Sequence, residues 1–252
     1  MPFASGDSDF PRVRLVKIGT LRVEADERPG PTLLALKRGL GVGGGSTVAL
    51  VESDLRLLVD TGFDFEEHDE EANRKRNAEA LVFALRLCGI APEMVDAVFI
   101  THWHRDHFGN LDLFPRARRL VSLPLREALN GNEFQGVADG EELATGVKVV
   151  YTPGHTDHHA SVLVTSRLAG LRTRIALAGD AVVSYSYFAQ GRVWRYNADF
   201  YNAREALESM RRLAAMCDLI VPGHGAPFVI CRPARQGASG RTGEAKARTT
   251  AE

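Results

Sequence analysis

The sequence of 252 residues predicts one domain of the α+β class. Two observations predict this class. Short apolar runs rich in Val, Ile, Leu and Phe recur along the chain, each about as long as one strand. Two longer segments, one in the first half of the chain and one in the second, carry apolar residues at helical spacing instead. No break in composition divides residues 10–231, so we expect a single domain there. Residues 232–252 have no apolar periodicity, and we expect a disordered tail.

Nine apolar runs are expected to form strands. The third ends in Asp60-Thr61-Gly62, and the fourth, residues 95–100, is a continuous apolar run apart from one aspartate, which is typical of a buried strand. The predicted strands are residues 13–18, 47–51, 55–59, 95–100, 119–122, 147–151, 161–165, 174–177 and 219–221.

Two helices are expected between these strands. The charged run 66–76 is the solvated start of the first helix, which Gly89 ends. The second helix begins at Asn202, a good N-cap residue, with Glu205 three residues later. Their core-facing positions are Ala78, Leu81, Val82 and Leu85 in the first helix, and Ala206, Leu207, Met210, Leu213 and Ala214 in the second.

Composition limits the classes of function. The net charge is −1, so no strong field directs the chain toward nucleic acid or an anionic membrane. The three cysteines lack a short metal-binding spacing, which favours reduced thiols. The N-terminus has no signal-peptide pattern, and no apolar run reaches the length of a membrane span. We therefore expect a soluble cytoplasmic protein that does not bind membranes.

Histidines and an aspartate gather directly after the strand 95–100, in the run Thr-His-Trp-His-Arg-Asp-His. Three of the eight histidines of the chain fall in this run, as His102, His104 and His107, together with Asp106. A loop at the end of a buried strand is held by a rigid sheet, which suits precise ligand geometry. The run therefore predicts a metal site.

Three further candidate ligands each follow an apolar strand and a glycine. They are His155, Asp180 and His224. A glycine before each ligand allows the loops to approach closely, because it has no Cβ atom. Five histidines and two aspartates suit zinc, and iron or manganese would also fit, whereas magnesium prefers oxygen ligands. Seven ligands exceed the needs of one tetrahedral ion, so two ions are predicted.

This pattern resembles the metallo-beta-lactamase superfamily, from Asp60-Thr61-Gly62 to His224, with its motif blocks in the family's order. The resemblance implies an αββα sandwich, in which two mixed sheets are flanked by helices. It also implies a role for each residue: His102, His104 and His155 hold the first metal, Asp106, His107 and His224 hold the second, Asp180 bridges both, and Asp60 orients a ligand histidine from behind.

The expected activity is dinuclear zinc-dependent hydrolysis. A hydroxide that bridges two ions attacks the substrate, and Asp106 orients it as a catalytic residue. An ester, thioester or lactone is the expected substrate. True class B beta-lactamases often have cysteine or serine where this chain has Asp180, so beta-lactam hydrolysis is expected only as a side activity. A flavodiiron-like redox role is disfavoured because its usual glutamate is missing.

An endoribonuclease or other phosphodiesterase is the alternative. The stretches 109–115 and 221–228 resemble small single-domain members of the metallo-beta-lactamase domain-containing protein 1 type, some of which are associated with RNA cleavage. The bulky Trp103 and Arg105 depart from that pattern. The alternative would use Arg192 and Arg195 as contacts to the RNA backbone.

An aromatic segment, residues 183–201, follows Asp180 and is expected to form a flap over an apolar substrate pocket, although core packing is the competing interpretation. A small molecule is the expected partner, with RNA and a homodimer left open. The glycine-rich segment 39–45 lacks a phosphate-loop ending and could form a mobile hairpin beside the site. The candidate substrate contacts are Tyr185, Tyr187, Trp194 and His158, with His159 beside it.

Overall fold

The computed structural model describes residues 10–21, 45–64, 69–195, 197 and 199–231. Within these residues the chain forms two six-stranded sheets. The first sheet contains β1 (Arg12–Lys17), β2 (Val48–Glu52), β3 (Arg56–Val59), β4 (Ala97–Phe99), β5 (Arg118–Ser122) and β6 (Phe134–Val137) in that order. The second contains β12 (Phe228–Val229), β11 (Leu219–Val221), β10 (Leu171–Leu177), β9 (Ala160–Leu168), β8 (Val147–Tyr151) and β7 (Glu142–Ala144).

Both sheets are mixed. In the first sheet, β1, β2 and β3 pair antiparallel, and β3 to β6 pair parallel. In the second sheet, only β10 and β11 pair parallel. Parallel pairing puts the carboxyl ends of neighbouring strands at the same edge, so the loops that follow them can build one site.

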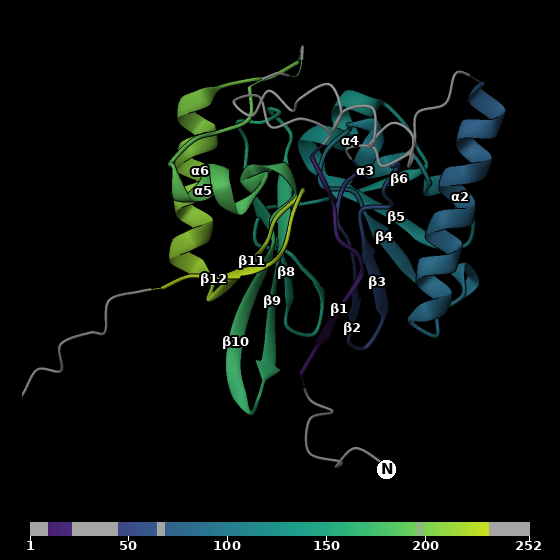
Figure 1. Ribbon diagram of the computed structural model, residues 1–252, viewed down its shortest axis with the longest axis horizontal. Helices are drawn as coiled ribbons and strands as arrows, with labels where there is room; N and C mark the ends of the chain where they lie inside the picture. The colour runs from purple at the N-terminus through teal and green to yellow at the C-terminus, as the bar shows by residue number, and fades with distance from the viewer. Residues whose placement is uncertain (1–9, 22–44, 65–68, 196, 198, 232–252) are drawn as a thin grey trace, which may run out of the picture.

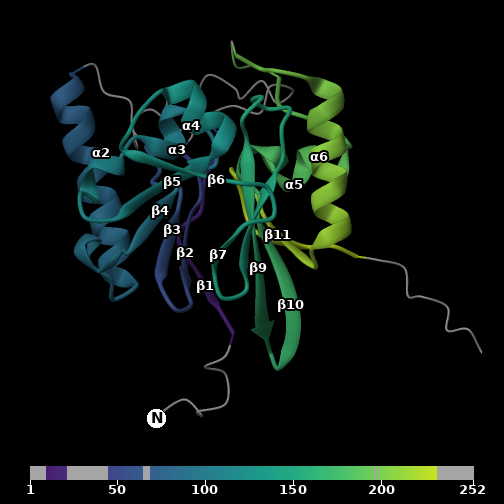
Figure 2. The same ribbon diagram turned by 180° about the vertical axis from the view of Figure 1, so that it is seen from behind.

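Helices cover the outer face of each sheet. The helix α2 (Glu70–Leu87) lies outside the first sheet, and α5 (Tyr185–Ala189) and α6 (Ala203–Met216) lie outside the second (Figure 1). The reverse view shows the same layering (Figure 2). Two short helices, α3 (Arg105–Phe108) and α4 (Leu123–Leu129), join strands of the first sheet. The predicted αββα sandwich is therefore confirmed.

Three apolar layers hold the sandwich together. The central layer lies between the two sheets and includes Val51, Phe99, Val149, Val162 and Leu177. Alternate residues of the same strands point to the outer layers, where Val98 packs with Leu81 and Leu85 of α2, and Ile220 packs with Met210 and Leu213 of α6. Both faces of the central strands are buried, which explains why their sequences are continuous apolar runs.

The structure corrects several predicted boundaries. The helix predicted from residue 66 begins at Glu70, with Asp69 as its N-cap, and residues 65–68 lie outside the described part. Within α2, Ala78 and Val82 are only half-buried, while Asn73 and Asn77 are buried in the same stripe as Leu81 and Leu85. The strand predicted at 161–165 is longer and continues to Leu168.

Some elements were not predicted. The strands β6, β7 and β12 and the helices α3, α4 and α5 are each seven residues or shorter, so they show little periodicity. Of the glycine-rich segment 39–45, only Gly45 is described, and the predicted tail 232–252 lies outside the described residues. No described helix combines the length and the apolar character that crossing a membrane requires.

Candidate metal centre

The seven candidate ligands come from four strand ends. His102, His104, Asp106 and His107 follow β4, His155 follows β8, Asp180 follows β10 and His224 follows β11. The backbone joins these loops directly. The amide of Gly223 donates to the carbonyl of Gly179 (3.0 Å), and the amide of Ala160 donates to that of Thr101 (2.9 Å). The structure therefore brings together the ligands that the sequence predicts for one centre.

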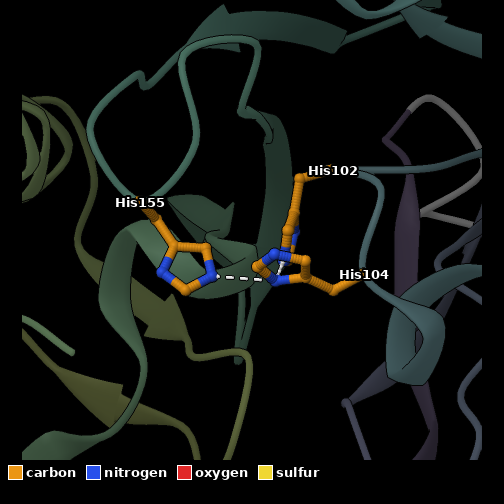
Figure 3. Close-up of side chains that lie close together, drawn as sticks. All are labelled: His102, His104 and His155. Atoms are coloured by element: carbon orange, nitrogen blue, oxygen red, sulfur yellow. Dashed lines mark hydrogen bonds between the residues drawn. The ribbon is translucent and has the colours of Figure 1, made fainter. Parts of the chain in front are cut away.

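His102, His104 and His155 form the first cluster. Their side chains point toward one another, His102 and His104 from the loop after β4 and His155 from the loop after β8 (Figure 3). The Nδ1 atom of His104 lies 2.8 Å from Nε2 of His102 and 3.1 Å from Nε2 of His155. Three convergent ring nitrogens from buried or half-buried side chains could hold a metal ion.

Asp106, His107 and His224 form the second cluster. The Oδ2 atom of Asp106 lies 3.3 Å from Nε2 of His224 and 3.7 Å from Nε2 of His107. These three side chains also have the spacing of metal ligands. The donors differ from those of the first cluster, because a carboxylate replaces one imidazole.

Asp180 lies between the two clusters. Its Oδ2 atom is 3.4 Å from Nε2 of His155, on the side of the first cluster. Its Oδ1 atom is 3.3 Å from Nε2 of both His107 and His224, on the side of the second. One carboxylate thus faces both clusters, which is the arrangement a bridging ligand needs.

The short helix α3 sets the positions of Asp106 and His107. It consists of a single turn that begins after His104, and the amide of Gly109 closes it on the carbonyl of Arg105. The carbonyl of His107 accepts hydrogen bonds from both the amide and the hydroxyl of Thr61, at 2.7 and 3.0 Å. The metal-binding turn is therefore tied to the end of β3.

Asp60 supports His107 from behind. The Nδ1–H group of His107 donates to Oδ2 of Asp60 at 2.7 Å, which leaves Nε2 facing the second cluster. The amide and hydroxyl of Thr101 also donate to the Asp60 carboxylate, at 2.9 and 3.0 Å. Asp60 has a φ of 59°, so the strand end turns sharply at the same residue. Asp60 therefore has both roles considered for it: it contacts the candidate ligand His107, and it forms the turn at the end of β3.

Two residues near the first cluster were not predicted. Asp199 has both carboxylate oxygens 2.9 Å from Nε2 of His104. The side-chain amide of Asn197 lies 3.2 Å from Nδ1 of the same ring. Both come from the irregular segment before α6, where local sequence carries no ligand motif. Spatial proximity across the fold is the only signal that identifies them.

The neighbouring residues His158 and His159 differ in burial and in their contacts. His159 is buried, with Nδ1 at 2.8 Å from the hydroxyl of Thr152, and its Nε2 accepts from the amide of Asp180 at 3.1 Å. The suggested substrate contact is therefore wrong for His159, because both ring nitrogens hold the protein together. His158 is partly exposed, and its Nδ1 lies 2.7 Å from the carboxylate of Asp157.

The predicted aromatic contacts lie at different depths. Tyr187 is buried and its ring meets that of Trp194 edge-on at 5.9 Å. The Nε1–H of Trp194 donates to Oδ1 of Asn197 at 2.6 Å, so Trp194 is linked to the first cluster through one side chain. Tyr185 is exposed, and its ring packs against that of Phe228 with 5.1 Å between the ring centroids. Trp194 is thus connected to the centre, and Tyr187 supports it.

The two clusters have opposite electrostatic character. Burial lowers the pKa of His155 to about 4, and burial with its charged neighbours holds the pKa of His102 well below its usual value. In the second cluster burial acts in the same direction, but nearby carboxylates outweigh it. Asp180 and Asp106 raise the pKa of His224 to about 10, and Asp60 and Asp106 hold that of His107 well above its usual value.

These pKa shifts predict that binding of metal to the second cluster releases protons. At pH 7 the metal-free protein keeps His224 and His107 protonated, whereas metal ligation requires neutral imidazoles. About two protons should leave on binding. Calorimetric titration of zinc in two buffers of different ionisation enthalpy measures this number, and a heat independent of the buffer would contradict the prediction.

The same shifts predict how pH affects folding of the metal-free protein. Protonated His224 contributes to the free energy of unfolding. This contribution is fully present below pH 6.5 and is lost as pH rises through about 10. His155 has the opposite effect, because stability is lost as pH falls from 6.5 toward about 4. Chemical denaturation of the chelator-treated protein across this range should therefore show stability falling on both sides of neutrality.

Comparison with known proteins agrees with the geometry. The sequence profile of the metallo-beta-lactamase superfamily matches residues 40–224. This chain belongs to the metallo-beta-lactamase superfamily. It is 34% identical over 201 residues to the metallo-beta-lactamase domain-containing protein 1 of Homo sapiens, which covers 77% of this chain and 68% of that protein. The resemblance predicted from the motif blocks is thereby confirmed.

Two further similarities concern proteins whose names state an activity. The atrochrysone carboxyl ACP thioesterase of Aspergillus fumigatus is 27% identical over 143 residues, covering 52% of this chain and 39% of that protein. A crystal structure of a quorum-quenching N-acyl homoserine lactone lactonase matches with a TM-score of 0.60 at 19% identity, covering 87% of this chain and 94% of that one. The second similarity shows the fold alone.

Proposed function

We propose that this superfamily member is a hydrolase that holds two zinc ions and cleaves esters, thioesters or lactones. The observation that carries the proposal is the position of Asp180, one carboxylate that faces two groups of metal-binding side chains. A single ion would need only one such group. Iron or manganese would suit the same donors.

The residues present fit metal ions. A zinc ion with bonds of about 2.0–2.1 Å separates its nitrogen ligands by roughly 3.3 Å, slightly more than the spacing in the first cluster. In the second cluster, Nε2 of His107 and Oδ1 of Asp180 are buried and face each other at 3.3 Å without forming a well-directed hydrogen bond. A bound cation would coordinate both atoms and take the place of the proton on His107.

Bound ions would lower the pKa of a water between them and polarise the carbonyl oxygen under attack. Asp106 is suited to handle the proton of that water. In the metal-free protein burial acts to raise the pKa of Asp106, but the charges of His107 and His224 outweigh it and lower that pKa. In the loaded site, cations in place of those two protons would act in the same direction. We assign to Asp106 the orientation of the water and the transfer of its proton to the leaving group.

The aromatic segment supports an acyl substrate. Trp194 is linked to His104 of the first cluster through Asn197, and the ring of Tyr187 packs against that of Trp194. Apolar side chains of this kind suit an acyl chain, and Arg192, one of the two arginines considered for RNA contacts, instead donates to Gln190 and lies over the Tyr187 ring. The names of the fungal thioesterase and of the lactonase both denote hydrolysis of an acyl substrate.

The test compares substrates on one metal-loaded preparation. Protein confirmed to hold two zinc ions is assayed with p-nitrophenyl esters, an acyl thioester, an acyl homoserine lactone and a labelled single-stranded RNA. We expect hydrolysis of an acyl substrate that a chelator and His102→Ala both abolish. Chelator-sensitive cleavage of RNA alone, lost in the same variant, would instead assign the protein as a phosphodiesterase. Turnover of none of these substrates would overturn the proposed substrate class.

A further inference from the structure

We propose that Asp199 is the positioning residue of His104, and that Asn197 and Trp194, which are linked to the same ring, are coupled to metal binding in the first cluster. The inference rests on the proposed function, because it requires that this cluster binds a metal ion. The relevant contacts join residues 95 positions apart in the sequence.

The geometry identifies which ring nitrogen of His104 would bind metal. Both oxygens of Asp199 lie 2.9 Å from Nε2, so Nε2 carries the proton and donates it to the carboxylate. Nδ1 is then left with its lone pair, and Nδ1 is the atom that converges on Nε2 of His102 and His155. A carboxylate that holds the outer nitrogen of a ligand histidine selects its tautomer and fixes its ring orientation.

Each cluster then has one histidine supported by a carboxylate. Asp60 supports His107 in the second cluster, and Asp199 supports His104 in the first. The two carboxylates differ in their surroundings, because Asp60 is buried whereas the side chain of Asp199 is 60% exposed. Asp60 lies at the buried end of β3, while Asp199 lies at the surface. The first cluster is therefore the one whose geometry depends on an exposed carboxylate.

A second residue before α6, Asn197, also contacts His104. The side-chain amide of Asn197 lies 3.2 Å from Nδ1 of His104, and its Oδ1 accepts from Nε1–H of Trp194 at 2.6 Å. Asn197 and Asp199 thus contact one ligand histidine, and Trp194 is linked to it through Asn197. The Asn197 amide and a metal ion would compete for the same Nδ1 lone pair, so metal binding would release the hydrogen bond through which Trp194 is linked to His104. Metal binding and the position of Trp194 should therefore depend on each other.

An exposed ion pair with no such role would contribute little, because surface pairs are screened by water and salt. The experiment therefore compares Asp199→Asn with Asp157→Asn. Asp157 is a matched control, since its carboxylate is 66% exposed and pairs with His158, which is not a metal ligand in the proposed centre. Zinc affinity is measured by competition with a chromogenic chelator, and the ligand field is measured from the absorption spectrum of the cobalt-substituted protein.

We expect Asp199→Asn to weaken binding of one zinc ion by about 10- to 100-fold and to change the cobalt spectrum. Asp157→Asn should leave both unchanged, and Asp199→Glu should restore part of the affinity because it returns a carboxylate. Equal zinc affinity and identical cobalt spectra in Asp199→Asn and the unaltered protein would overturn the inference. If the unaltered protein bound no zinc, the proposed function itself would fail, so the two failures are distinguishable.

Discussion

Replacement of Asp180 by asparagine is expected to lower kcat/KM by about 10³-fold, roughly 4 kcal/mol, and to remove at least one metal ion. Asparagine has nearly the same volume, so the change removes charge and leaves packing intact. Asp180 is buried and faces Nε2 of His107 and His224 on one side and of His155 on the other. Without its charge, both clusters lose the anion that lies between them.

The measurement is metal content by mass spectrometry alongside steady-state kinetics. Asp112→Asn is a suitable control, because Asp112 is an exposed carboxylate that pairs with Arg119 at 3.7 Å, outside both clusters. An Asp180→Asn protein with two metal ions and activity within tenfold of the unaltered protein would show that Asp180 does not bridge. Circular dichroism of the metal-free variants separates this effect from loss of the fold.

Replacement of Gly223 by alanine should have the second largest effect. A Cβ atom at this position would lie 2.1 Å from Oδ1 of Asp180 and 2.9 Å from the carbonyl carbon of Gly179. Neither neighbour can move freely, since Asp180 is held among three histidines and the amide of Gly223 donates to the carbonyl of Gly179. We expect about 10²-fold lower activity and about 1–3 kcal/mol lower stability.

The comparison for this variant is Gly131→Ala. There a Cβ atom would approach the side chain of Phe134 no closer than 3.3 Å. Kinetics, metal content and the free energy of unfolding are measured for both proteins. Gly223→Ala should lose activity and metal together, because it displaces a ligand. A Gly223→Ala protein as active and as stable as Gly131→Ala would mean that the loop adapts without cost.

The fold class and the candidate ligands could be predicted because both leave local signals. Strands buried on both faces are continuous apolar runs, as Leu57, Leu58 and Val59 in β3 illustrate. The ligands follow such runs directly, after β4 in the first sheet and after β8, β10 and β11 in the second, so each of them has a local signal in the sequence. The short elements were missed because a helix of one turn, such as α3, has no measurable period.

The sequence by itself determined the chemistry of this centre, namely which histidines and aspartates stand at strand ends and to which superfamily the pattern belongs. Only the tertiary structure decided how each ring is held. It placed His159 behind Asp180 as a buried support, and it brought Asp199 to His104 across 95 positions. The physical reason is that a strand end is a local feature, whereas a hydrogen bond between distant loops depends on how the two sheets and their helices pack.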